Sequence, residues 1–315
     1  MGSWSRAAPL ALLPLLAWGC PSTDGFTGGG DASPEGAADV VVTDAPADGG
    51  ADVVTGRCDP TKPFGATGAI PAIDDGQTQV GGARWSSDEL SMVYTQNDSV
   101  DGGTNENLYL ATRTSTTAQW NAGVAITGVN SPDNDSDGYL LDDGVTLFFS
   151  SERVLPIQLF VATRASSTQP FGAPQPVSSG NITDDILRVF FMPDGTTAYF
   201  IDSALNNFID QAQIDRDAGI GQPLQLSNDN SDWPCVTGDG LTMLYDHVSS
   251  GEVWQTTRAT TTDTFQSGVP VAELSGGAGT NTSPTWVSRD GCVVVMQSDR
   301  GGSGILQIYV AQRGK

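Results

Sequence analysis

Short apolar runs recur along the chain in groups of four, separated by turn residues. The clearest group lies between Gly138 and Val177, where the runs GYLL, VTLFFSS, IQLFVATR and FGAPQPV follow one another. Apolar and polar positions that alternate over four to eight residues predict β-strands, and the Asp-Gly and proline breaks predict turns. The pattern therefore predicts an antiparallel unit of four short strands.

This unit occurs five times. Alignment on the turn between the first two strands brings five dipeptides into register, with spacings of 55, 51, 45 and 51 residues: Asp88-Glu89, Asp143-Gly144, Asp194-Gly195, Asp239-Gly240 and Asp290-Gly291. Four-stranded units repeated at about 40–50 residues are typical of β-propeller blades. The third copy matches least well, because its third strand lacks the arginine that closes the other four.

The fifth copy ends after its third strand, but a matching fourth strand stands at the other end of the domain. Residues 63–70 read PFGATGAI and resemble residues 170–177, which read PFGAPQPV. We expect this N-terminal strand to complete the last blade, because closure leaves no open sheet edge. The sequence thus predicts an all-β fold over residues 60–315, a five-bladed β-propeller of four-stranded blades.

Residues 1–20 have the features of an export signal. Arg6 precedes an apolar run, Ala7 to Trp18, that is too short to span a bilayer comfortably, and the run ends at Cys20. This end resembles a bacterial lipoprotein signal, in which the cysteine receives the lipid. Ordinary signal cleavage near this point is the alternative. Lipidation at Cys20 would anchor the protein to a membrane without a spanning helix.

Residues 21–59 are rich in Gly, Ala, Asp and Pro and contain eight acidic residues against Arg57 alone. This composition predicts a disordered acidic linker. The whole chain has a net charge of −23, and residues 60–315 contain 29 acidic and 12 basic residues. Nucleic acids and anionic membrane surfaces are therefore not expected as partners, since phosphate binding needs clustered Lys and Arg. Basic proteins, cations and neutral glycans remain open.

The strand–DG–strand–strand pattern, with LYLATR, LFVATR and IYVAQR in its third strands, resembles the TolB-type WD-like propeller repeats of bacterial envelope proteins. The resemblance covers about residues 63–313. It implies a monomeric platform for a protein or glycan partner, in the periplasm or at the cell surface. The better-known member has six blades and an extra N-terminal domain, whereas this chain shows five blades and no such domain.

Six residues between the first two blades have the spacing of a calcium loop. Asp133, Asp135 and Asp137 alternate before Gly138, so their oxygens could converge on one hard cation. The glutamate that closes an EF-hand is absent, because Gly144 stands at the twelfth position. The alternative is a solvated acidic connection, since Asp and Asn are common in turns.

The connections between blades carry further aspartates, among them Asp75, Asp185 and Asp232. In a propeller these connections gather on one face around the central channel, where an acidic rim would attract a cation or a basic partner. The alternative is that turns in an acidic protein are simply rich in aspartate.

No catalytic motif is present. His247 is the only histidine, and its position at the end of a second strand favours hydrogen-bonded packing over a role as a general base. Carboxylate pairs suited to glycoside hydrolysis are the rival interpretation. Trp85, Tyr139, Phe190 and Trp286 recur in first strands and are expected mainly in the core.

Three cysteines remain besides Cys20, and disulfides persist in exported proteins. Cys292 begins the second strand of the last blade, and Cys58 precedes the strand expected to close that blade. We therefore expect a Cys58–Cys292 disulfide, with Cys235–Cys292 as the competing pair.

Overall fold

The computed structural model describes residues 56–315 except 75, 77, 99–104, 181, 204–207, 227–230 and 303. The secondary structure of these residues is β-sheet, and no α-helix occurs among them. The signal peptide, Cys20, the linker up to residue 55 and Asp75 lie outside the described residues.

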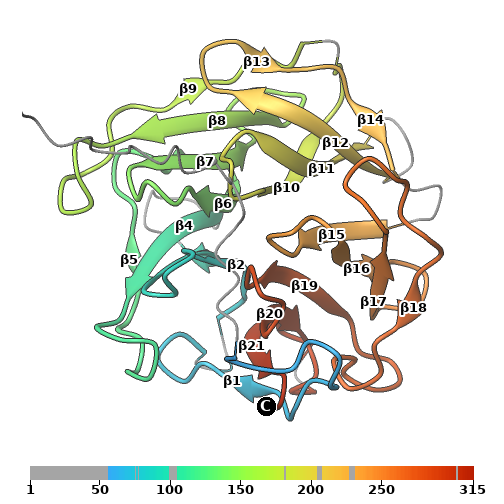
Figure 1. Cartoon of the computed structure of the whole chain (residues 1–315). Helices are drawn as coiled ribbons and strands as arrows, with labels where there is room; N and C mark the ends of the chain where they lie inside the picture. The colour runs from blue at the N-terminus through green and yellow to red at the C-terminus, as the bar shows by residue number, and fades with distance from the viewer. Residues whose placement is uncertain are drawn as a thin grey trace, which may run out of the picture. The chain divides into compact units, whose positions relative to one another are not determined.

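Five antiparallel sheets form the ring in Figure 1. Blade one contains β2 (Val80–Trp85), β3 (Ser91–Asp98), β4 (Asn105–Thr112) and β5 (Val124–Ala125). Blade two contains β6 (Asp135–Leu140), β7 (Thr146–Ser151), β8 (Gln158–Thr163) and β9 (Gln175–Pro176). Blade three contains β10 (Ile186–Phe191), β11 (Thr197–Asp202) and β12 (Phe208–Asp215), with β13 (Gly219–Ile220) and β14 (Leu224–Gln225) both paired to β12.

The ring continues with blade four, which contains β15 (Ser231–Val236), β16 (Thr242–His247), β17 (Glu252–Thr257) and β18 (Val269–Pro270). Blade five contains β19 (Thr282–Val287), β20 (Val293–Ser298), β21 (Gln307–Gln312) and β1 (Gly68–Ala69). The predicted five-bladed propeller is therefore confirmed.

The N-terminal strand closes the ring, as the sequence predicts. Gly68 of β1 pairs with Val310 of β21, and Phe64 forms a further antiparallel bridge to Arg313. Blade five is thus built from both ends of the folded domain, so the first and last blades are joined by main-chain hydrogen bonds.

The propeller has two faces. The turn face carries the hairpins between first and second strands, such as Asp143-Gly144 and Asp290-Gly291. The mouth face carries the loops between second and third strands and the connections between blades. First strands begin at the mouth face and run toward the turn face, so the two ends of the central channel are lined by different residues.

The arginine that closes four of the third strands has one structural role. Arg164 stacks over Phe171 at 4.5 Å and donates Nε–H to the Gly144 carbonyl at 2.9 Å. Arg113, Arg258 and Arg313 make the corresponding pair of contacts. In blade three Ile214 stands at this position and packs in one core cluster with Ile220 of the extra strand β13.

The first-strand aromatic residues belong mainly to the core. Trp85, Phe190 and Trp286 are buried, and Tyr139 is partly buried. Trp85 and Trp286 belong to different blades but have ring centroids 5.6 Å apart. These side chains therefore hold neighbouring blades together.

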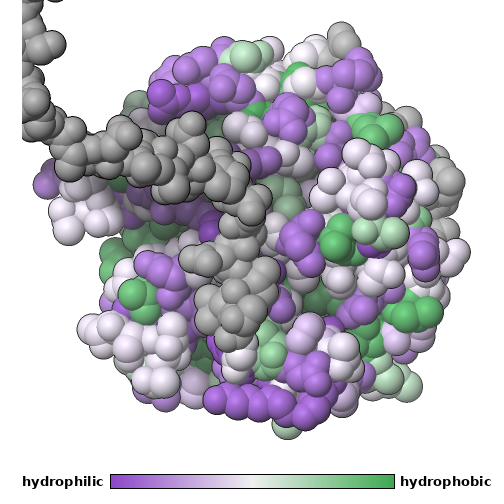
Figure 2. All heavy atoms as spheres, in the orientation of Figure 1, coloured by the Kyte–Doolittle hydropathy of each residue, from purple (hydrophilic) through white to green (hydrophobic). Residues whose placement is uncertain are grey.

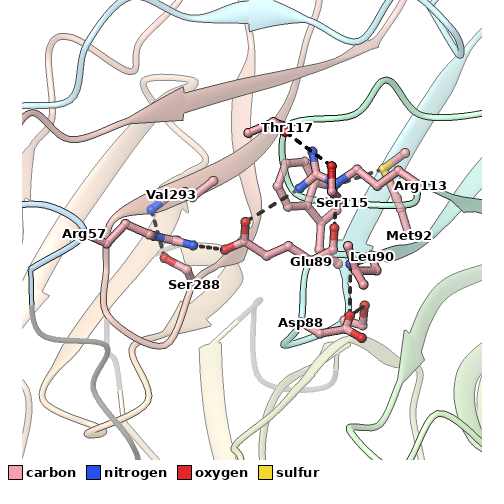
Figure 3. A network of polar contacts seen from close by, with 12 residues as sticks. Arg57, Asp88, Glu89, Leu90, Met92, Arg113, Ser115, Thr117, Ser288 and Val293 are labelled. Atoms are coloured by element: carbon pink, nitrogen blue, oxygen red, sulfur yellow. Dashed lines mark hydrogen bonds and ion pairs between the residues drawn. The ribbon is translucent and has the colours of Figure 1, made fainter.

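The segment before β1 is fixed to the turn face. Cys58 and Cys292 form the predicted disulfide, and Cys235 is free and buried. Arg57 forms an ion pair with Glu89 of blade one (Figure 3). A second ion pair joins Arg57 to Asp290 of blade five at 3.2 Å. The chain therefore enters the propeller at the turn face, across the junction of the first and last blades.

Candidate functional site

A β-bulge in four of the first strands turns one residue per blade into the left-handed region. These residues are Gly82, Asp137, Arg188 and Trp233, with φ between 53° and 59°. Side chains with positive φ are uncommon, and bulges re-aim the side chains they carry. The repeat therefore brings Asp137, Arg188 and Trp233 from three blades to the same level of the channel.

An ion pair joins two of these residues. Arg188 Nη1 lies 3.0 and 3.1 Å from the two carboxylate oxygens of Asp137, and the Arg188 main-chain N–H donates to the same carboxylate. The Arg188 guanidinium stacks over the Trp233 ring at 4.2 Å. Its Nε lies 3.7 Å from Asp232 Oδ1. Blades two, three and four are thus connected at the mouth of the channel.

A cavity of about 220 Å³ opens at this level, and we call it the mouth pocket. Its lining is mostly polar and includes Thr95, Glu106, Ser136, Asp137, Arg188 and Gln297. Its volume is below the roughly 300–1,000 Å³ that is typical of small-molecule sites. The pocket therefore has room for a single side chain or a small polar group.

The carboxylates around the pocket differ in their protonation chemistry. Burial, and then the negative charge of Asp137, raises the pKa of Glu106, which lines the pocket. Burial also raises the pKa of Asp246 to about 7, against a hydrogen bond from Ser283 Oγ at 2.8 Å. Asp232 lies opposite Asp246 in the sheet, and burial raises its pKa as well. The aspartate pair does not line the mouth pocket.

A buried arginine lies close to this group. Arg84 is only 3 % exposed, and its guanidinium carbon lies 5.5 Å from the Trp233 ring centroid and 6.0 Å from that of Tyr139. Its Nε and Nη1 have no hydrogen-bond partner. Burial lowers the pKa of this guanidinium, while the charge of Asp137 opposes that shift. The aromatic rings and Asp137 are therefore the groups that stabilise the cation.

Side chains cross the axis at the opposite end. Arg289 of blade five forms an ion pair with Asp142 of blade two, and these blades are not neighbours in the ring. A second, smaller cavity behind this pair is lined by Tyr139, Phe190 and Trp286. Access to the mouth pocket is therefore from the mouth face.

Two aspartates of the predicted calcium loop form ion pairs with arginines. Asp135 is buried and forms an ion pair with Arg153 at 2.7 Å, whereas Asp137 pairs with Arg188. Asp133 is exposed. Within the described residues no group of three or more His, Cys, Asp or Glu side chains is placed to hold a metal ion. Calcium binding at this loop stays a prediction, and it would compete with both arginines.

The predicted acidic rim is brought together only in part. Asp232 belongs to the network around the mouth pocket through Arg188. Asp185 instead accepts a hydrogen bond from the main-chain N–H of Ile157 at 2.7 Å, which connects blades two and three. Asp75 lies outside the described residues, so the rim as a whole stays a prediction.

His247 makes the packing contacts expected of it. Its ring stacks on Trp254 with centroids 4.3 Å apart, and Nδ1 lies 3.1 Å from Ser249 Oγ. Neither contact joins the histidine to a carboxylate, as a catalytic triad would.

The sequence analysis missed Glu106, Arg188 and Asp246 as site residues. One feature of the sequence could have pointed to Arg188 as a site residue. It is a basic residue at the start of a first strand, in a chain with few basic residues. Glu106 and Asp246 lie in third and second strands, where nothing in the local pattern distinguishes them from surface positions. Their approach to the pocket depends on how the blades pack.

Comparison with known proteins gives likenesses of fold. No protein-family model and no curated protein matches the sequence. Among solved structures, a TolB protein from Agrobacterium tumefaciens is 16% identical, with 70% of each chain covered and a TM-score of 0.45. A GH43_1 enzyme from Xanthomonas citri is 12% identical, with a TM-score of 0.52 over 78% of this chain and 90% of that one. A calcium-binding regucalcin from A. tumefaciens is 13% identical, covering 81% and 96%, with a TM-score of 0.46.

Four sheets of four strands and one of five form the blades, and together with the repeat pattern they define a five-bladed β-propeller. At 11–16% identity the likenesses describe the fold alone, and no activity follows from them. None of the described residues forms a helix with the length and apolar character needed to cross a bilayer.

Proposed function

We propose that this protein is a non-catalytic envelope lipoprotein whose propeller binds a protein partner through the mouth face. The observation that carries the proposal is the mouth pocket, which is polar and small and is lined by residues at that face. A pocket of about 220 Å³ fits one inserted side chain better than a small-molecule substrate.

Exposed apolar side chains on the same face support a protein partner. Val154 and Leu155, in the loop between β7 and β8, are 47% and 75% exposed, and Val248 in the β16–β17 loop is 41% exposed. The space-filling view in Figure 2 shows hydrophobic residues scattered among hydrophilic ones. Protein interfaces combine exposed apolar side chains with polar groups, and the mouth face carries both.

The chemistry of the pocket favours a basic side chain on the partner. Glu106 lines the pocket, and burial raises its pKa, so a cationic group beside it would stabilise the carboxylate. The 29 acidic against 12 basic residues of the folded part would also steer a basic partner toward the protein. A glycan has less support, because Trp85, Trp233 and Trp286 are buried and offer no open ring for stacking.

The entry of the chain at the turn face fits an anchored platform. An anchor at Cys20 would be connected to the propeller through the linker and then through Arg57 and Cys58, which lie on the turn face. This arrangement supports the division into a signal peptide (1–20), a linker (21–59) and a propeller (60–315).

One observation favours the rival function, a glycan-active hydrolase. Asp232 and Asp246 face each other, and the pKa of Asp246 is raised to about 7, as a general acid requires. The pair does not line the mouth pocket, which gives the hydrolase less support than the platform. An Asp246-dependent release of sugar from envelope glycans would establish the hydrolase instead.

The platform is tested by capture from native envelope extracts, followed by affinity measurement with the purified partner. Glu106→Lys, which reverses the charge in the pocket, should weaken binding at least tenfold. Asp217→Lys, the same reversal at an exposed position on the turn face, should bind as the parent does. Equal binding by both variants would contradict the proposal.

Cys20→Ala should move the protein from the membrane fraction to the soluble fraction; unchanged fractionation would contradict the anchor.

A further inference from the structure

Blade three departs from the other blades at one position of its third strand. The third strands of blades one, two, four and five carry an aromatic residue there, and each lies opposite a residue of the preceding strand: Tyr109, Phe160, Trp254 and Tyr309. In blade three the same register position holds Asp210, opposite Phe200. An acidic residue thus replaces the ring that in blades one, two and four contacts an aromatic ring of the preceding strand.

The carboxylate of Asp210 is buried without a partner. The residue is 1% exposed, and neither carboxylate oxygen has a hydrogen-bond donor among the described residues. Leaving a carboxylate buried and unpaired costs several kcal/mol, whereas buried carboxylates are normally paired or bound to metal. The replacement of an aromatic residue by a costly group indicates a requirement beyond packing.

A second carboxylate shares the same side of the sheet. Asp202 of β11 lies two residues from Phe200, so it is the diagonal neighbour of Asp210 across the β11–β12 pair. Diagonal neighbours on one face have Cβ atoms about 7 Å apart, a distance at which two carboxylates reach one ion with metal–oxygen distances of about 2.4 Å. Asp202 is also largely buried, and its charge acts on Asp210. Two acidic groups therefore meet in a region of low solvent access.

We propose that Asp202 and Asp210 form a binding site for a divalent cation in blade three. Carboxylate oxygens are the ligands of hard cations, and Ca²⁺ tolerates flexible coordination whereas Mg²⁺ demands a near-ideal octahedron, so we expect Ca²⁺ here. The ion supplies the positive charge that Asp210 lacks. This site is distinct from the loop at Asp133, whose buried aspartates pair with arginines, and it does not depend on the function of the mouth face.

The test is the thermal unfolding of the metal-depleted full chain at pH 7.5, with and without 1 mM CaCl₂. Ion binding to the folded state alone should raise the Tm of the parent by about 5 °C. Asp210→Asn should lose this response. Asp210→Tyr, which installs the residue of blades one and five, should also lose it while melting at or above the metal-free parent. The tyrosine variant separates loss of the ion from loss of the fold.

Asp133→Asn is the matched control, because it removes an exposed carboxylate from the calcium-like loop. Its calcium response should equal that of the parent, and calorimetric titration should give one ion per chain. The proposal is overturned if calcium leaves the parent unchanged. It is also overturned if Asp210→Asn responds as the parent does, or if Asp133→Asn alone abolishes the response.

Discussion

Asp232 and Asp246 face each other across β15 and β16 although both are acidic. Like charges in directly opposed positions destabilise a sheet, and burial adds to the cost. Arg188 offsets part of it, because its charge lowers the pKa of both aspartates. Asp246 is the better residue with which to measure the net cost of burying the two carboxylates. One of its carboxylate oxygens accepts a hydrogen bond from Ser283, and the other has no partner among the described residues.

The raised pKa of Asp246 predicts a pH-dependent stability. A carboxyl group with a folded pKa of about 7 and an unfolded pKa near 3.8 stabilises the fold at low pH, and this contribution is lost as pH rises through 7. Asp246→Asn should therefore raise the free energy of unfolding at pH 8, by about 2–3 kcal/mol. At pH 4 the variant should differ little from the parent. Urea denaturation at both pH values measures this, with the exposed Asp217→Asn as control; a constant difference between parent and Asp246→Asn would contradict it.

At the scale of the blade, the contacts of the arginine that ends the third strands explain why it recurs in four blades. Arg258 is buried, stacks over Phe265 at 4.4 Å and donates to the Gly240 carbonyl at 2.7 Å. It also donates to Tyr199 Oη of blade three at 2.9 Å. The side chain thus fixes a hairpin, a third strand and the neighbouring blade. Blade three dispenses with the arginine because Ile214 and β13 fill the corresponding space.

Arg258→Met should lower the free energy of unfolding by about 2–4 kcal/mol. The methionine keeps part of the packing over Phe265, but it leaves the Gly240 carbonyl without its donor. Arg216→Met, at an exposed position of blade three, should change stability by less than about 0.5 kcal/mol. Thermal or urea unfolding of the two variants makes the comparison. Similar losses in both would show that the stacked arginine is only a surface group.

At the scale of the whole molecule, closure depends on the N-terminal segment. β1 supplies the outer strand of blade five, the disulfide joins Cys58 to Cys292, and Arg57 bridges blades one and five. The two cysteines are 234 residues apart in sequence. A crosslink over so long a loop restricts the unfolded chain strongly.

Cys58→Ser/Cys292→Ala should therefore lower the free energy of unfolding by about 2–5 kcal/mol under oxidising conditions. The parent should approach the variant after reduction, whereas the reductant should not affect the variant. Cys235→Ala provides the control for loss of a buried thiol. An oxidised parent no more stable than the double variant would show that β1 and Arg57 hold the ring closed without the disulfide.

The number of blades, the closing strand and the disulfide followed from the amino-acid pattern. Strand alternation and Asp-Gly turns are local signals, and five copies in one order reinforce each other. The match between residues 63–70 and 170–177 identified the closing strand, because both segments occupy the same place in a blade. Cys58 then lay next to the blade that contains Cys292.

The mouth pocket could not be predicted from the amino-acid pattern, because its residues come together only when the ring closes. Asp137, Arg188 and Trp233 lie about fifty residues apart, and bulges of the main chain direct them to one level. Asp135 and Asp137 have the spacing of calcium ligands, but packing between blades supplies Arg153 and Arg188 as their partners. Short-range periodicity is sufficient to specify a repeated strand, whereas the partner of a buried charge depends on which blade lies beside it.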